Sequence, residues 1–123
     1  MPQPDKKYEE IPKWDRAEVE RAVRENNPNE LLYAVVAVSM HDKDWRYAQD
    51  LCVKLSSHSH FNVRGNALLG FGHIARVHRK LDSSIVQPII QAALKDSDKY
   101  VRGHAWDAAD DTSHFLGWHY DRN

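Results

Sequence analysis

The sequence predicts an all-α protein of about five or six helices, arranged as stacked helical hairpins. Val63-Arg64-Gly65 recurs as Val101-Arg102-Gly103, 38 residues later, and the surrounding residues align without a gap. A repeat of this length is typical of hairpins that bury their apolar faces only against neighbouring units. Apolar residues elsewhere recur mainly at helical spacing, and no segment reads convincingly as a strand.

The chain length is suited to one domain with a single core. Its 123 residues include three prolines before residue 13, so we expect an irregular N-terminal arm over residues 1–13. Residues 14–123 then form one helical domain. Trp14 is expected to anchor the end of the arm.

Charge and cysteine content argue against several classes of protein. The 17 lysines and arginines nearly cancel the 18 aspartates and glutamates, whereas a general nucleic-acid binder carries a basic excess. Cys52 is the single cysteine, which excludes an internal disulfide and makes a thiolate zinc site improbable. The sequence has no apolar run of membrane-spanning length and no apolar secretory signal, so we expect a cytoplasmic protein without membrane contact.

The first two helices are predicted from their start signals. Asp15 and Glu18 have the spacing of a capping box, which predicts a helix over Arg16–Glu25. Asn27 followed by Pro28 is a typical helix start, so the next helix covers about residues 29–41. The many β-branched residues of this segment would also fit a strand, but its start and its helical neighbours favour a buried helix.

The next hairpin contains an amphipathic helix over residues 45–57 and a longer helix from residue 61 or 62 to residue 79. The longer helix contains Gly65, Gly70 and Gly72. A glycine inside a helix costs about 1 kcal/mol relative to alanine, so close packing against another helix is the expected reason for all three.

The last hairpin pairs residues 83–95 with residues 99–118. Pro88 lies within the first of these helices, where it either kinks the helix or moves its true start towards residue 87. Val77 and Ile85 are among the apolar side chains expected to face the core.

Residues 85–105 resemble a HEAT repeat of the short bacterial type. They have an apolar helix with a proline near its start, an Asp-rich turn, and a Val-Arg pair opening the second helix. The resemblance extends over about residues 45–117 and implies a short right-handed α-solenoid. It also implies that Arg64 and Arg102 bond aspartates or carbonyls of adjacent turns as scaffold residues, and that the Val-Arg helices line a concave, partner-binding face.

The eight histidines raise the question of a metal site. His58 and His60 flank Ser59 in a predicted loop, and no two histidines stand four residues apart, the spacing that places two imidazoles on one helix face. We therefore expect no metal and no cofactor. A metal-dependent enzyme using the histidines and aspartates is the less favoured alternative.

Asp107, Asp110 and Asp111 fall on one face of the last predicted helix. Such a face is either simply solvated or binds a basic partner, which would relieve the repulsion between the carboxylates. No nucleophile motif or phosphate-binding loop accompanies the cluster, so catalysis is not expected. Trp118 and Tyr120, near the C-terminus, either cap the open end of the stack or anchor an interface.

The run Ala67-Leu-Leu-Gly-Phe-Gly-His-Ile-Ala-Arg76 resembles small immunity proteins of HEAT-like type from interbacterial toxin systems. The resemblance implies a non-enzymatic module that binds and neutralises a cognate toxin domain, by contact-dependent inhibition or a similar system, with no direct contact to nucleic acid. An adaptor subunit of a larger complex is the other alternative. The predicted partner-binding residues are Asn66, His73, Trp106, Asp107, Asp110, Asp111 and His114.

Overall fold

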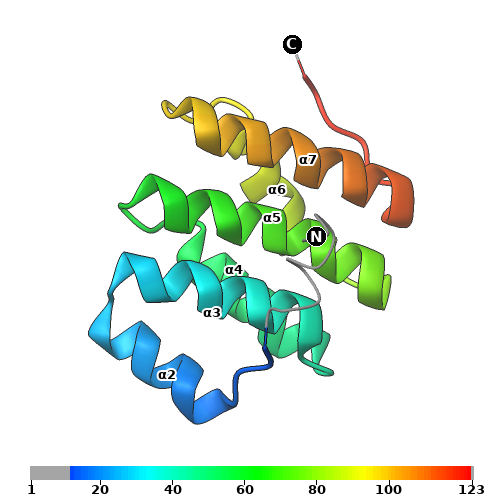
Figure 1. Ribbon diagram of the computed structural model, residues 1–123. Coiled ribbons are helices and arrows are strands. Elements are labelled where there is room, and N and C mark those ends of the chain that lie inside the picture. The colour runs from blue at the N-terminus through cyan, green and yellow to red at the C-terminus, as the bar shows by residue number, and fades with distance from the viewer. Residues whose placement is uncertain (1–11, 123) are drawn as a thin grey trace, which may run out of the picture.

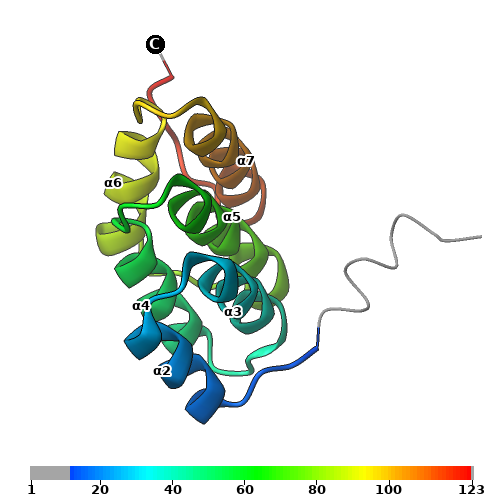
Figure 2. The same ribbon diagram turned by 60° about the vertical axis from the view of Figure 1, so that its left-hand side comes forward.

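The computed structural model describes residues 12–122, and this part of the chain contains six α-helices and no strand. Figure 2 shows them in two layers, one of α2, α4 and α6 and the other of α3, α5 and α7. Helices adjacent in sequence pack as the pairs α2–α3, α4–α5 and α6–α7, and the last two of these pairs are those that the sequence predicted. Of the predicted arm, residues 1–11 lie outside the described residues. The helices are α2 (Arg16–Glu25), α3 (Pro28–His41), α4 (Trp45–Leu55), α5 (Phe61–His78), α6 (Ser83–Ala93) and α7 (Lys99–Leu116).

Polar caps fix the helix starts, which explains why the sequence predicted them closely. The capping box at α2 is complete, since the Asp15 carboxylate accepts the Glu18 amide at 2.8 Å and the Glu18 carboxylate accepts the Asp15 amide at 3.3 Å. The helix ends are less regular: α4 and α6 each end two residues earlier than predicted. Helix α7 stops at Leu116 because Gly117 adopts a left-handed conformation with φ of 73°.

Helix α5 lies between α3 and α7 in its layer and packs on α4 of the other layer (Figures 1 and 2). Its glycines allow this close approach. A Cβ at Gly65 would lie 2.7 Å from the Tyr100 ring on α7, and one at Gly70 would lie 2.7 Å from the Cys52 sulfur on α4. The predicted reason for the glycines is therefore confirmed at both positions.

Two residues predicted to face the core do not. Ile85 is 43% exposed, because α6 packs on one side only and buries the narrow stripe that contains Val86 and Ile90. Val77 is 50% exposed in the last turn of α5, where the buried residue is Ala75. Pro88 does not displace the start of α6, which begins at Ser83 with Pro88 inside the helix.

The two turn arginines act as scaffold residues in different ways. Arg64 forms two parallel hydrogen bonds to the Asp96 carboxylate of the next turn, at 3.0 and 3.2 Å, and two more to carbonyls of its own loop. Arg102 donates to the carbonyls of Asp96 and Ser97, both in its own turn, at 2.8 and 3.2 Å. Arg64 therefore links successive hairpins, whereas Arg102 closes a single turn.

Candidate partner-binding surface

Helix α7 carries most of the predicted binding residues and is the outermost helix of its layer (Figure 1). Its N-cap is Asp98, whose carboxylate accepts a hydrogen bond from the Tyr100 amide at 2.8 Å. Ala105 and other small apolar residues on its inner side are fully buried. The opposite side therefore exposes Trp106 and Asp107.

The three predicted aspartates are not equivalent. The side chains of Asp107 and Asp110 are 61% and 66% exposed, whereas Asp111 is half-buried against the backbone of α5. Burial raises the pKa of Asp111, against the lowering effect of Arg76. The exposed acidic face of α7 therefore consists of two carboxylates rather than the three predicted from spacing.

The predicted binding residues of α5 lie in its contact with α7. Asn66 is 9% exposed and donates to the Tyr100 hydroxyl at 3.2 Å. His73 is 7% exposed, with its Nδ1 3.1 Å from Arg76 and with no hydrogen-bond partner for its buried Nε2 among the described residues. Burial and the nearby positive charge of Arg76 lower the pKa of His73 to about 4, so the ring is neutral at physiological pH. Both side chains have little surface available for a partner.

The remaining predicted residues are exposed on α7. Trp106 is 42% exposed, and the Arg122 guanidinium lies over its ring at 4.6 Å. Arg122 also bonds the Asp110 carboxylate at 2.8 Å. His114 is exposed one helical turn further on, beside Phe115. The structure thus brings Trp106, Asp107 and Asp110 together on one side of α7 and adds Arg122 to them.

The C-terminal segment, residues 117–122, covers the end of the stack. The Tyr120 and Thr112 hydroxyls are 2.6 Å apart, and Trp118 and Tyr120 pack against the hydrophobic core. The Gln91 amide makes two hydrogen bonds to the backbone of Asp121, at 2.6 and 2.9 Å. These contacts favour the capping role for the C-terminal aromatic residues over an interface role.

The described histidines make local contacts with the protein. The His58 ring lies 2.7 Å from the Asn26 side chain, His60 caps α5, and the His78 ring lies 3.1 Å from the Asp42 carbonyl. Within residues 12–122, no group of three or more histidine, cysteine, aspartate or glutamate side chains is placed to hold a metal ion. No helix in this part of the chain is long and apolar enough to cross a membrane.

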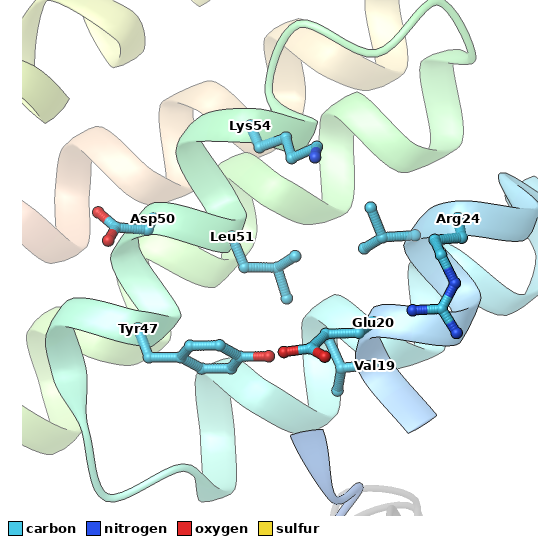
Figure 3. A pocket seen from close by; sticks show the side chains of 8 residues that line it. Val19, Glu20, Arg24, Tyr47, Asp50, Leu51 and Lys54 are labelled. Carbon is cyan, nitrogen blue, oxygen red and sulfur yellow. The ribbon is translucent and has the colours of Figure 1, made fainter. Parts of the chain in front are cut away.

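Two surface hollows were not predicted. A groove of about 430 Å³ between α2 and α4 has an apolar floor that includes Val19 and Leu51, and Figure 3 shows the Tyr47 hydroxyl pointing towards the Glu20 carboxylate at its edge. The second hollow, of about 550 Å³, lies on α7 around Gly103, and we call it the Gly103 hollow. It is lined by Lys99, Tyr100, Gly103, His104 and Asp107.

Sequence reasoning missed both Arg122 and the Gly103 hollow as parts of this surface. Arg122 reaches α7 only because the C-terminal segment folds back, which no local pattern indicates. The hollow did have a signal, because the repeat pairs Gly103 with Gly65.

Comparison with known proteins finds a solved structure with a similar fold. No protein-family model matches this chain, and no curated protein matches it. Its structure is similar to a chain in the crystal structure of the CDI complex from Cupriavidus taiwanensis LMG 19424, with a TM-score of 0.75 and 23% sequence identity. The similarity covers 86% of this chain and 94% of that chain. It shows a shared all-α fold, while the HEAT-like resemblance stays a prediction.

Proposed function

We propose that this chain is an immunity protein that binds and neutralises a cognate toxin domain of a contact-dependent inhibition system or a similar one. The observation that carries the proposal is the similarity, over nearly the full length of both chains, to a member of a CDI complex. The resemblance of residues 67–76 to immunity proteins supports it independently.

The environments of its reactive groups favour the inhibitor over the toxin as the role of this chain. The Cys52 thiol is fully buried, and burial raises its pKa to about 12, so it is not a nucleophile at neutral pH. His73 is buried and neutral, and Asp110 is paired with Arg122. These side chains are better suited to structure and recognition than to acid–base chemistry.

The exposed side of α7 supports binding of a basic protein partner. Trp106 supplies an exposed aromatic side chain of the kind enriched in interfaces. Asp107 and Asp110 supply two exposed carboxylates, and the second is paired with Arg122. Acidic charge on an inhibitor accelerates its association with a basic toxin, and Asp107 is the stronger contributor to that charge.

A co-expression experiment tests the function. The probe is the product of the reading frame immediately upstream, which we expect to contain the toxin domain, expressed in cells with or without this chain. We expect the domain alone to stop growth and this chain to restore it, with direct binding measured by calorimetry. Growth arrest caused by this chain alone would identify it as the toxin member instead, and continued arrest with both proteins expressed would refute the immunity function.

Charge reversal tests the binding surface. We expect the double variant Asp107→Lys, Asp110→Lys to lose most of its affinity while keeping a wild-type circular dichroism spectrum. Asp111 is left unchanged because it packs against α5. The matched control reverses Glu20 and Asp50, two exposed acids of the other layer, and is expected to bind normally. Equal affinities for the two double variants would refute the role of the α7 surface.

A further inference from the structure

The contact between α5 and α7 contains a notch occupied by an aromatic ring. Because Gly65 has no side chain, the Tyr100 ring fits against the α5 backbone, 2.7 Å from the point that a Cβ would occupy. Beside the notch, the Asn66 amide donates to the Tyr100 hydroxyl at 3.2 Å. The contact therefore combines a glycine, an aromatic ring and one polar residue next to the glycine.

The internal repeat reproduces this notch on the exposed side of α7. A shift of 38 residues places Gly65 on Gly103 and Asn66 on His104. Helix α5 is followed by α7 in its layer, but α7 is the last described helix. Apart from its chain neighbours and the α7 backbone, no atom of the described residues lies within 4 Å of a Cβ built at Gly103. The same surface is the open Gly103 hollow. The C-terminal segment leaves it uncovered, since that segment lies along α6 and near Trp106.

We infer that the Gly103 hollow is the docking point for an aromatic side chain of the protein partner, which inserts there as Tyr100 inserts at Gly65. This inference rests on the proposed immunity function. His104, the counterpart of Asn66, packs edge-on against Tyr100 with ring centroids 4.4 Å apart and also lines the hollow, where an inserted ring would meet it. Asp107, which is 61% exposed, and the exposed Lys99 line the hollow with one carboxylate and one ammonium group, so the matching partner surface carries a basic group on the Asp107 side of its aromatic residue.

The contacts beside the hollow favour a different protein over a second copy of this chain as the occupant. In a two-fold dimer, the hollow of each copy would take a side chain from the same patch of the other copy. Tyr100 already fills the Gly65 notch, so the exposed aromatic residue available next to Gly103 in that patch is Trp106. The Arg122 guanidinium lies over the Trp106 ring at 4.6 Å, so insertion of Trp106 would displace Arg122. A different protein that supplies its own aromatic residue leaves this contact intact.

The test measures, by calorimetry, how full-length variants bind the toxin domain identified by the co-expression experiment. Gly103→Met fills the hollow, and we expect it to weaken binding by about 30-fold or more, the loss typical of a central interface residue. Gly103→Ala adds a single Cβ atom, for which the equivalent notch at Gly65 has no room. We expect this variant to weaken binding by about tenfold. The control is Ala92→Met, at an exposed position of α6 in the other layer. We expect its affinity to stay within about twofold of the wild-type affinity.

Folding and partner identity are checked separately. The thermal midpoints of both Gly103 variants should be no lower than that of the wild type, because glycine is the poorer helix former. In the toxin domain, one aromatic-to-alanine change should weaken binding strongly and be non-additive with Gly103→Met.

The outcomes separate this inference from the proposed function. Failure of the wild-type chain to bind the toxin domain would refute the immunity function and, with it, this inference. Wild-type binding with unchanged affinity of Gly103→Met would refute the docking point alone. Self-association of the wild type that Gly103→Met abolishes in sedimentation experiments would show a second copy as the occupant and would also overturn the inference.

Discussion

Replacing Arg64 by methionine should destabilise the protein more than the same change at Arg102. The two residues occupy equivalent positions in the repeat, and both donate two hydrogen bonds to carbonyls of their own turn. Only Arg64 also bonds the carboxylate of Asp96, in the following turn. The difference between the two variants therefore isolates the contact that joins successive hairpins.

The structure sets the size of this difference. The side chains of Arg64 and Asp96 are 18% and 19% exposed, so water screens the pair less than it screens a surface ion pair. Exposed pairs contribute about 0.2–1 kcal/mol, whereas hydrogen bonds to charged groups contribute about 1.5–3 kcal/mol. We expect the Arg64→Met variant to lose about 1.5 kcal/mol more than Arg102→Met, at the lower end of the range for hydrogen bonds to charged groups. With an unfolding entropy of about 2.1 cal/mol/K per residue over 123 residues, the thermal midpoints should differ by about 6 °C.

Urea unfolding followed by circular dichroism measures the difference at neutral pH and in acid. The hydrogen bond from Arg64 lowers the pKa of Asp96 below its ordinary value of 3.8. A carboxyl group with a lowered folded-state pKa stabilises the fold above the unfolded value and loses this contribution as the pH falls through the folded one. The gap between the variants should therefore shrink below pH 3.8. Equal losses for the two variants at neutral pH would refute the inter-hairpin role of Arg64.

Two further predictions concern helix α5 and its counterpart in the repeat. The pKa of His73 is lowered from 6.5 to about 4, so between these pH values the unfolded state binds a proton that the folded state does not. The protein should therefore lose up to about 3 kcal/mol of stability as the pH falls from 6.5 to 4. Urea titrations of the wild type and of His73→Leu over this pH range should show that the free energy of unfolding depends less on pH in the variant. The same pH dependence in both proteins would contradict the lowered pKa of His73. Gly70→Ala should cost about 1 kcal/mol net, because overpacking against Cys52 outweighs the better helix propensity, whereas Gly103→Ala should gain up to about 1 kcal/mol. Unfolding midpoints that move in the same direction would contradict this contrast.

The helices and their pairing could be predicted because their signals are local. Asp15, Asn27 and Pro28 mark helix starts by short-range hydrogen bonds and fixed backbone angles, which depend little on the rest of the fold. The depth of burial was less predictable. Ile85 and Val77 fit the apolar pattern of a helix, but the width of the buried stripe depends on how many neighbours that helix has.

The candidate site was predicted only in outline for the same reason. Spacing placed three aspartates on one face, but the packing of Asp111 on α5 removed one of them from the surface. Asn66 and His73 are polar, and nothing in their local sequence shows that they lie in the contact with α7. Such positions depend on tertiary packing, which propensity and periodicity do not encode.

The two sides of α7 have separate constraints on their sequence. Val101 and Ala105 hold the helix against the core, while Gly103 and Asp107 face outward and contribute little to that packing. A change on the outer side therefore costs little folding free energy. If this side recognises a toxin, the specificity of the protein can diverge by single substitutions without compensating changes in the core, as an inhibitor that must follow a changing toxin requires.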